Sequence, residues 1–287
     1  MKQWPVELDY PIVTFTDVHG QRLFLERLLE RLAERPEWPD CSVVFVGDYV
    51  DRGPDVRGTI EVIIELMRRH PAPVTAVMGN HDLALIRAAR LDDGAASDYW
   101  IQRYLDSYDH DATFRAYLHR MPHLAWKEEL LALRDAIPAA HRRFLSTLPW
   151  LVEAPGHLFL HCGLSPELEQ SADEQLEALR ARRWDDSLRP VAGTLTETLW
   201  QLDYPVWLGA DRRLADAPLP ASGRVQVTGH KPVPAPDVNP VRIRLDTSGG
   251  FHEPLTACLL ASPDAPPVFV RSSSPIPPRE AARSGGS

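Results

Sequence analysis

The sequence predicts an α/β domain, and the order of its apolar segments is the basis for this prediction. Short runs of β-branched and aromatic residues occupy 12–16, 43–46 and 74–78, and each run is followed at once by polar residues or glycine. Between them, residues 21–34 and 56–70 carry apolar side chains at helical spacing, with charged side chains on the opposite face. The order is β-α-β-α-β, which predicts parallel strands joined by right-handed crossovers.

The middle of the chain predicts a helical insertion from about residue 83 to residue 149. This stretch is rich in helix formers, acids and aromatic residues, and Pro138 is suited to the first turn of a helix. Strand-like runs then return, mostly separated by proline-rich turns, and they favour a second, largely antiparallel set of strands. These runs occupy residues 157–160, 225–228, 241–245, 255–260 and 268–270.

We expect one domain over residues 1–270 and a disordered tail over residues 271–287. A chain of 287 residues is long enough to bury a core. The tail is rich in serine, proline, glycine and arginine and has no apolar pattern.

Composition and charge narrow the class of protein. The chain has 31 Lys and Arg against 40 Asp and Glu, a formal net charge of −9, which argues against a nucleic-acid polymer as partner because phosphate backbones require clustered cations. The three scattered cysteines, Cys41, Cys162 and Cys258, favour a reducing compartment. The first residues lack the apolar core of a signal peptide, and no run approaches the roughly 20 apolar residues of a membrane span. We therefore expect a cytoplasmic protein without a membrane partner.

Polar clusters follow five of the expected strands. The three early strands end in DVHG at 17–20, GDYVDRGP at 47–54 and GNHD at 79–82. Two later strands end in HCG at 161–163 and GHK at 229–231. Because open α/β sheets place their ligand sites at the carboxyl ends of strands, we expect these clusters to meet in one site.

The side chains in these clusters predict a pair of metal ions. Aspartate, histidine and asparagine offer donors suited to Mn, Fe or Zn. Two ions about 3.5 to 4 Å apart suit phosphoester hydrolysis, because they orient phosphate oxygens and neutralise their charge. Only Asp17 and Asp48 among the candidate ligands are charged, so two divalent ions would keep surplus positive charge, which predicts an anionic substrate. The candidate ligands are Asp17, His19, Asp48, Asn80, His161 and His230.

The spacing of the clusters resembles the PPP-type metallophosphoesterases, which include serine/threonine protein phosphatases and bacterial diadenosine tetraphosphatases. The resemblance rests on DxHG, GDxVDRG and GNHD, followed by a His-x-Gly and a Gly-His, and it covers residues 12–260 in order. It implies a four-layer α/β/β/α sandwich of two mixed sheets, with the helical insertion as a cap. Asp82 stands where most eukaryotic members have glutamate, which is typical of the bacterial branch.

The resemblance also implies which residue holds which ion. It places Asp48 as the bridge between two divalent ions, with Mn favoured and Fe or Zn as alternatives. The implied ligands are Asp17, His19 and Asp48 for one ion and Asp48, Asn80, His161 and His230 for the other.

The same resemblance implies the catalytic residues. His81 would protonate the leaving oxygen, and Asp51 would orient His81 and favour its cationic form. Arg52, together with Asn80 and Arg212, would bind phosphate oxygens, for which the planar guanidinium is well suited.

The implied reaction is hydrolysis of a phosphomonoester by direct attack of a metal-bound hydroxide on phosphorus. Our first hypothesis is a protein phosphatase that acts on phosphoserine, phosphothreonine or phosphotyrosine. The alternative is a hydrolase of dinucleoside polyphosphates such as diadenosine tetraphosphate. A binding protein that has kept the fold without catalysis is disfavoured, because the predicted ligand set is complete. The expected partner is therefore a phosphorylated protein or a small phosphoester.

Each of three further sequence features allows two interpretations. Six aspartates between Asp92 and Asp111 could repel acidic substrates or recognise basic ones, or simply form a solvated helical face. Cys162 follows a predicted ligand, and we interpret it as a small packed residue rather than a redox-sensitive one. The aromatic residues of the insertion either stack on a nucleobase or pack within a helical core; they are Trp100, Tyr104, Tyr108 and Phe114.

Overall fold

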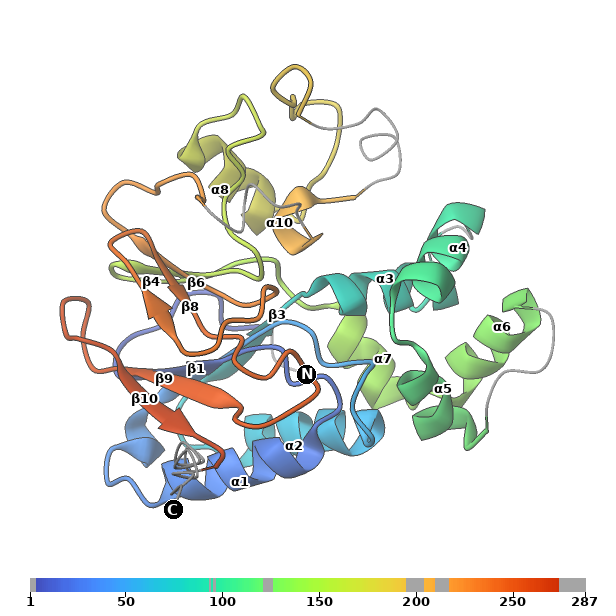
Figure 1. Cartoon of the computed structure of the whole chain (residues 1–287), viewed down its shortest axis with the longest axis horizontal. Coiled ribbons are helices and arrows are strands. Elements are labelled where there is room, and N and C mark those ends of the chain that lie inside the picture. The colour runs from blue at the N-terminus through green and yellow to red at the C-terminus, as the bar shows by residue number, and fades with distance from the viewer. Residues whose placement is uncertain are drawn as a thin grey trace, which may run out of the picture.

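In the computed structural model, two five-stranded sheets face each other and helices lie on their outer sides (Figure 1). The structure describes residues 4–92, 94, 97–120, 126–194, 204–209 and 217–273. The predicted α/β sandwich of two mixed sheets is confirmed. None of the helices within these described ranges is long and apolar enough to cross a membrane.

The first sheet contains the predicted β-α-β-α-β unit. Its strand order is β10-β9-β1-β2-β3; β1, β2 and β3 are parallel, and β9 and β10 are added in antiparallel pairing. Helices α1 and α2 form the crossovers and lie side by side along one face of this sheet (Figure 1). The elements are β1 Ile12–Phe15, α1 Arg22–Ala33, β2 Ser42–Val46, α2 Val56–Arg69, β3 Val74–Val77, β9 Thr256–Leu260 and β10 Val268–Arg271.

The strand pairing of the second sheet differs from the largely antiparallel pairing that we expect from the sequence. Its order is β4-β5-β6-β8-β7, and the central strands β5, β6 and β8 are parallel rather than antiparallel, whereas β9 and β10 belong to the first sheet. The long connection between β5 and β6 contains helix α8 and returns the chain to the same end, as parallel pairing requires. Apolar patterns identify a strand but not its partner. The strands are β4 Val152–Ala154, β5 His157–Phe159, β6 Val225–Thr228, β7 Asp237–Val238 and β8 Arg242–Arg244.

Alternate residues of the first sheet pack into two different cores. In β2, Val43 and Phe45 pack on the helical side, whereas Val44 and Val46 pack between the sheets with Phe159 of β5. All five side chains are fully buried. Burial on both faces explains why the early strands are continuous apolar runs instead of alternating patterns.

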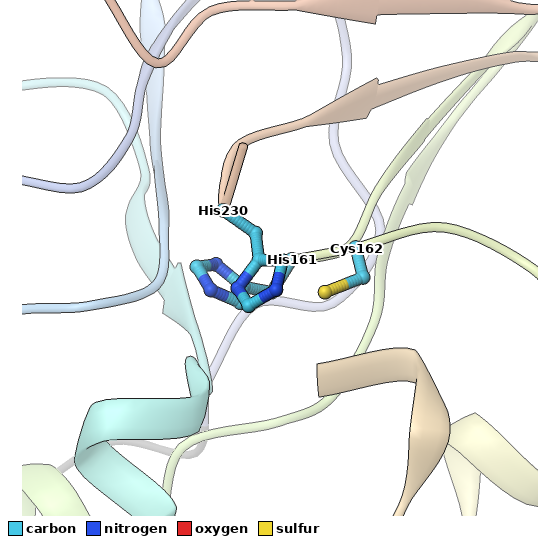
Figure 2. Close-up of side chains that lie close together, drawn as sticks. All are labelled: His161, Cys162 and His230. Atoms are coloured by element: carbon cyan, nitrogen blue, oxygen red, sulfur yellow. The ribbon is translucent and has the colours of Figure 1, made fainter. Parts of the chain in front are cut away.

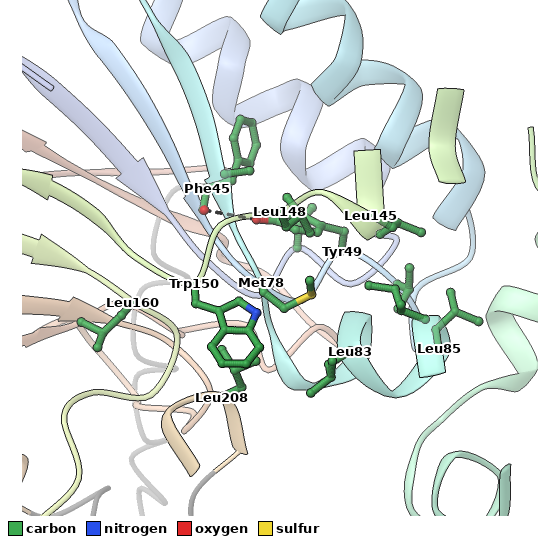
Figure 3. Close-up of a cluster of buried hydrophobic side chains, with 14 of the residues drawn as sticks. Phe45, Tyr49, Met78, Leu83, Leu85, Leu145, Leu148, Trp150, Leu160 and Leu208 are labelled. Carbon is green, nitrogen blue, oxygen red and sulfur yellow. Dashed lines mark hydrogen bonds between the residues drawn. The ribbon is translucent and has the colours of Figure 1, made fainter. Parts of the chain in front are cut away.

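The segment after β3 is helical, as predicted, and it lies beside the carboxyl ends of the first sheet (Figure 1). Figure 3 shows how its base is fixed: Tyr49 and Met78, which follow β2 and β3, pack with Leu83 and Leu145 from the insertion. Pro138 immediately precedes helix α7. The helices are α3 Asn80–Ala89, α4 Asp98–Ser107, α5 Asp111–Leu118, α6 Trp126–Ala136 and α7 Ala139–Ser146, followed by α8 Ala172–Arg180 and α10 Val206–Gly209.

The carboxyl end of the described chain continues slightly past the expected domain boundary. Arg271 pairs with Thr256 in the sheet, and the hydroxyl of Ser272 accepts a hydrogen bond from the backbone N–H of Leu255 at 3.0 Å. Two residues of the predicted tail, Arg271 and Ser272, thus take part in the fold, and residues 274–287 of that tail lie outside the described residues.

Glu153 joins β4 to two other parts of the second layer. Arg180, at the end of α8, donates to both of its carboxylate oxygens at 2.7 and 2.8 Å, and Arg224 donates to one of them at 2.9 Å. Burial alone would raise the pKa of Glu153, but Arg180 and Arg224 lower it below its ordinary value. The ionised carboxylate therefore stabilises the folded state.

We expect Glu153→Gln to lower the free energy of unfolding by roughly 1.5–3 kcal/mol at neutral pH, the range for hydrogen bonds to charged groups. Because the folded-state pKa lies below the ordinary value of 4.5, this contribution is present above pH 4.5 and is lost as the pH falls through the folded-state pKa. Urea denaturation of both proteins from neutral to acidic pH measures the difference. The matched control is Glu61→Gln, which removes an exposed helical pair with Arg57 and should cost about 0.5 kcal/mol or less. If Glu153→Gln lowers the free energy of unfolding no more than the control does, the stabilising role of the Glu153 carboxylate is contradicted.

Candidate metal centre

All six predicted ligands lie together at one edge of the two facing sheets. The first sheet contributes the residues that follow β1, β2 and β3, and the second sheet contributes those that follow β5 and β6. Because parallel strands end at the same edge, this arrangement follows from the topology. The residues brought together are Asp17, His19, Asp48, Asn80, His161 and His230.

The backbone of this edge is strained. A non-glycine residue with a left-handed φ costs about 1–3 kcal/mol and is kept only where the surroundings fix it, most often at functional sites. Six of the ten such residues that fall within the described ranges belong to the predicted site. They are Asp17, His19, Asp48, Asp51, Arg52 and His230, with φ of 52°, 43°, 59°, 68°, 60° and 67°.

The donor atoms lie at the spacing of ligands that share an ion. Oδ2 of Asp48 is 3.4 Å from Nε2 of His19 and 3.3 Å from Nε2 of His161. Oδ1 of Asn80 is 3.1 Å from Nε2 of His161 and 2.8 Å from Nδ1 of His230. Two donors about 2.1 Å from one ion and at right angles to each other are about 3 Å apart. The donor set therefore fits two divalent cations, with Asp48 between the two groups.

Backbone carbonyls orient two of the histidines. Nδ1 of His19 donates to the carbonyl of Val50 and Nδ1 of His161 donates to that of Val46, both at 2.8 Å. Each ring therefore directs Nε2 toward Asp48. Metal-binding histidines are commonly fixed in this way by a hydrogen bond at the other nitrogen.

The buried charges of the centre compensate one another. Burial alone would raise the pKa of Asp48, but His161 and His81 hold it well below its usual range. Burial alone would lower the pKa of His161, but the Asp48 carboxylate raises it to about 10. Burial lowers the pKa of His230 to about 3, so this imidazole is neutral and keeps a lone pair for a cation.

His81 and Asp51 form the predicted pair beside the ligands. Nδ1 of His81 lies 2.8 Å from Oδ2 of Asp51. The other oxygen of Asp51 accepts hydrogen bonds from Thr113 at 2.6 Å and from Tyr104 at 2.8 Å. Burial lowers the pKa of His81, and the carboxylates of Asp48 and Asp51 raise it by a smaller amount. The pKa of His81 therefore lies below its ordinary value, although Asp51 favours the cationic form as expected.

Helices α4 and α5 thus hold the carboxylate that orients His81. Tyr104 lies in α4 and Thr113 in α5, and both side chains are fully buried. The sequence pattern favours only stacking or core packing for Tyr104 and does not indicate a role for Thr113. No sequence spacing connects either residue to Asp51, which lies more than 50 residues earlier in the chain.

Arg52 covers the centre from the side of His81. Its Nη2 lies 3.1 Å from Nε2 of His81, and its Nη1 donates to Nε2 of His19 at 2.9 Å and to the carbonyl of Gly249 at 2.7 Å. This position suits a phosphate-binding guanidinium. Arg212, the other predicted phosphate-binding arginine, lies outside the described residues.

Asp82 fixes the two loops that carry Asp48 and Asn80. Its Oδ2 accepts from the backbone N–H of Asp48 at 2.9 Å and of Gly79 at 3.0 Å, and its Oδ1 accepts from that of Tyr49 at 3.0 Å. Burial raises the pKa of Asp82 to about 7, and Asp48 adds to this shift. In the sequence, Asp82 is distinguished only as a departure from glutamate. The sequence feature that could have identified this role is an acid three residues after Gly79. From that position the side chain of Asp82 caps the start of α3.

Cys162 lies beside two of the predicted ligands. Figure 2 shows its sulfur directed toward the rings of His161 and His230, and one donor atom from each of the three lies within 4.8 Å of the others. The thiol is buried, as a packed small residue would be, and the backbone N–H donates to the carbonyl of Trp207 at 3.0 Å.

We expect Gly79→Ala to disrupt the centre, because the added Cβ would collide with the backbone nitrogen and carboxylate of Asp48. Metal content after loading with Mn should fall below that of the original protein, as measured by mass spectrometry of the dialysed protein. Gly223→Ala is the control: its φ of 75° makes the change strained, but its Cβ meets nothing within 4 Å. The control should lose stability without losing metal. Equal metal content in Gly79→Ala and the original protein would argue against this centre.

Solved structures with the same fold differ in their reported activities. The crystal structure of a candidate diadenosine tetraphosphatase aligns with a TM-score of 0.54 and 22% identity, over 93% of this chain and 96% of that one. A cold-active protein-tyrosine phosphatase from a psychrophilic Shewanella species aligns with a TM-score of 0.53 and 18% identity, over 95% of this chain and 84% of that one. At these identities the likeness concerns the fold alone.

Curated relatives and a family model match this chain in sequence, and the match to the family model includes all six predicted ligands. Symmetrical bis(5′-nucleosyl)-tetraphosphatases of Burkholderia pseudomallei and Burkholderia mallei are each 30% identical over 188 residues, which is 64% of this chain and 54% of theirs. The chain thus spans about half the length of the curated relatives it matches. The model of the calcineurin-like phosphoesterases matches residues 10–234, which is most of the chain. The chain therefore belongs to the calcineurin-like phosphoesterase family.

Proposed function

We propose that this phosphoesterase holds two divalent cations at the candidate metal centre and hydrolyses dinucleoside polyphosphates. The observation that supports the substrate is the 30% identity with relatives named symmetrical bis(5′-nucleosyl)-tetraphosphatases. This was our alternative from the sequence, and the comparison moves it ahead of the protein phosphatase. The two hypotheses require the same residues at the centre.

The residues of the centre fit the metal dependence of the family. The proposed ligands combine oxygen and imidazole donors, a set suited to Mn, with Fe and Zn as alternatives. Bound there, two cations would neutralise phosphate charge and lower the pKa of a nucleophilic water. Asp48 would bridge the ions. The remaining proposed ligands are Asp17 and His19 on one side, and Asn80, His161 and His230 on the other.

The chain's own residues then act on the substrate. Arg52 would bind the oxygens of the scissile phosphate, since its guanidinium lies over the centre within reach of both His19 and His81. Asp51 keeps Nδ1 of His81 hydrogen-bonded, so Nε2 is the atom that faces the site. In the imidazolium form of His81, Nε2 would carry the second proton and donate it to the leaving oxygen, which leaves a neutral imidazole. The oxygens of Asp51 are themselves fixed by Thr113 and Tyr104.

A phosphoprotein is the second candidate substrate, and the acidic surface near Arg52 favours it. The carboxylate of Asp109 lies 3.4 Å from the guanidinium of Arg52, and both Asp109 and Asp111 are more than half exposed. Exposed carboxylates at the mouth of a site repel a polyanion and attract a basic peptide.

One assay separates the two substrates. The Mn-loaded protein is offered diadenosine tetraphosphate beside a panel of peptides that carry phosphoserine, phosphothreonine or phosphotyrosine, and kcat/KM is compared. We expect a preference of about a hundredfold or more for the dinucleotide. A preference of similar size for any phosphopeptide would overturn the proposed substrate and leave the phosphoesterase assignment intact.

Asp48→Asn should be the most damaging single change among the ligands. A bridging carboxylate serves both cations, and without it the two positive charges repel each other across a short gap. Metal content should fall from two ions per chain toward one or none. Asp237→Asn, which removes a carboxylate paired with Arg244 in the second sheet, should keep both ions. Two ions and near-normal turnover in Asp48→Asn would show that the bridge is assigned wrongly.

His81→Asn should keep both ions and lose about 10²- to 10⁴-fold in rate, the usual contribution of a general acid. The loss should depend on the leaving group: a nitrophenolate leaves readily without a proton, whereas the alkoxide of serine needs one. Arg52→Ala should affect both substrates equally, because both contain the same phosphate oxygens. The measurement is kcat/KM on nitrophenyl phosphate and on a phosphoserine peptide. Equal losses for His81→Asn on the two substrates would exclude the acid role.

A further inference from the structure

A cavity of about 350 Å³ opens beside the catalytic residues. It is lined mainly by the end of α4, the start of α5 and the loop after β8, through Arg52, Tyr108, Asp109, His110, Arg115 and Phe251. None of these residues is among the proposed metal ligands, and only Arg52 has a role in the mechanism proposed above. The cavity is therefore an unassigned part of the site.

Contacts with His81 place this cavity on the leaving-group side. The ring of Tyr108 packs edge-on against the ring of His81, with centroids 4.6 Å apart and an interplanar angle of 90°. Arg52, the other wall nearest the centre, lies 3.1 Å from Nε2 of His81. Since His81 is proposed to protonate the leaving oxygen, the atoms attached to that oxygen extend toward Tyr108 and Arg52.

The cavity presents an exposed aromatic ring. Phe251 is 58% exposed, and the guanidinium of Arg52 lies 5.1 Å from its ring centroid. This cation–π contact holds the ring in place from one side. The exposed surface of an orientated ring is a platform on which a flat heterocycle can stack.

The charges around the ring balance one another. Arg52 and Arg115 contribute two guanidinium groups, and Asp109 and Asp111 contribute two carboxylates. A lining with two positive and two negative groups gives no net attraction for a chain of phosphates. The phosphates would instead be bound by the two metal cations and Arg52. It suits an uncharged group whose amino and hydroxyl groups donate hydrogen bonds to carboxylates.

We infer that this cavity is the subsite for the nucleoside of the departing nucleotide, with Phe251 stacked on its base. The inference rests on the proposed dinucleoside polyphosphate activity and adds the residue that recognises the leaving group. It also gives the surface carboxylates a role: Asp109 and Asp111 accept hydrogen bonds from the nucleoside rather than selecting a basic peptide.

Binding of ADP and of inorganic pyrophosphate to the Mn-loaded protein tests the subsite directly. Both ligands carry a diphosphate, but only ADP carries a nucleoside. Calorimetry should show that Phe251→Ala weakens ADP about tenfold or more, in line with base–aromatic stacking, and leaves pyrophosphate unchanged. Phe251→Trp should retain ADP affinity. Val238→Ala, which truncates a similarly exposed apolar side chain in β7, should change neither ligand. Unchanged ADP affinity in Phe251→Ala, or an equal loss for both ligands, would overturn the inference.

Kinetics separate a failure of the subsite from a failure of the proposed substrate. With diadenosine tetraphosphate, Phe251→Ala should raise KM about tenfold or more, whereas hydrolysis of inorganic tetraphosphate should be unaffected. If the original protein prefers phosphopeptides, the proposed function is wrong, and the comparison of ADP with pyrophosphate still decides the subsite. If Phe251→Ala weakens only the phosphopeptides, the cavity receives a peptide and the inference is wrong.

Discussion

Three backbone N–H groups donate to the carboxylate of Asp82, and the geometry of the centre depends on this contact. Two of them belong to the loop after β2, at Asp48 and Tyr49, and the third belongs to Gly79 at the start of α3. The carboxylate thereby ties together the two loops that present Asp48 and Asn80. It also offsets the strain at Asp48, whose left-handed backbone needs surroundings that allow no other conformation.

The second requirement is that the two sheets keep their relative position. Nδ1 of His161, from the second sheet, donates to the carbonyl of Val46 at the end of β2 in the first. In the other part of the centre, the backbone N–H of His230 donates to the carboxylate of Asp17 at 3.0 Å. Gly229 lets these chains approach, since a Cβ there would collide with Thr16 and Asp17. The apolar core between the sheets thus determines the distances among the proposed ligands.

The sequence predicted the parts of the site that repeat a local pattern. Five of the expected strands end in a polar cluster, and the six proposed ligands at these ends meet in the fold. The family resemblance was confirmed as well. Strand pairing was not predictable, because β5, β6 and β8 look alike whether they run parallel or antiparallel. The partners of Asp51 were also missed, because a hydrogen bond between a strand-end carboxylate and a distant helix leaves no trace in residue spacing. The proposed roles of Tyr108 and Phe251 could not be predicted from the sequence either, because only the fold brings both residues to one cavity.

The hydrogen bonds of Tyr104 and Thr113 to Asp51 make the helical insertion an integral part of the catalytic apparatus. A peripheral insertion can usually be shortened, exchanged or grafted without touching the chemistry of its host. Here its removal would leave a buried carboxylate without the two donors that fix it, and His81 without a defined orientation. Divergence within this lineage should therefore alter the outward surfaces of the helices while the inner faces of α4 and α5 stay constant. In this protein, α4 and α5 each belong to the active site through their inner face and to the scaffold through their outer face.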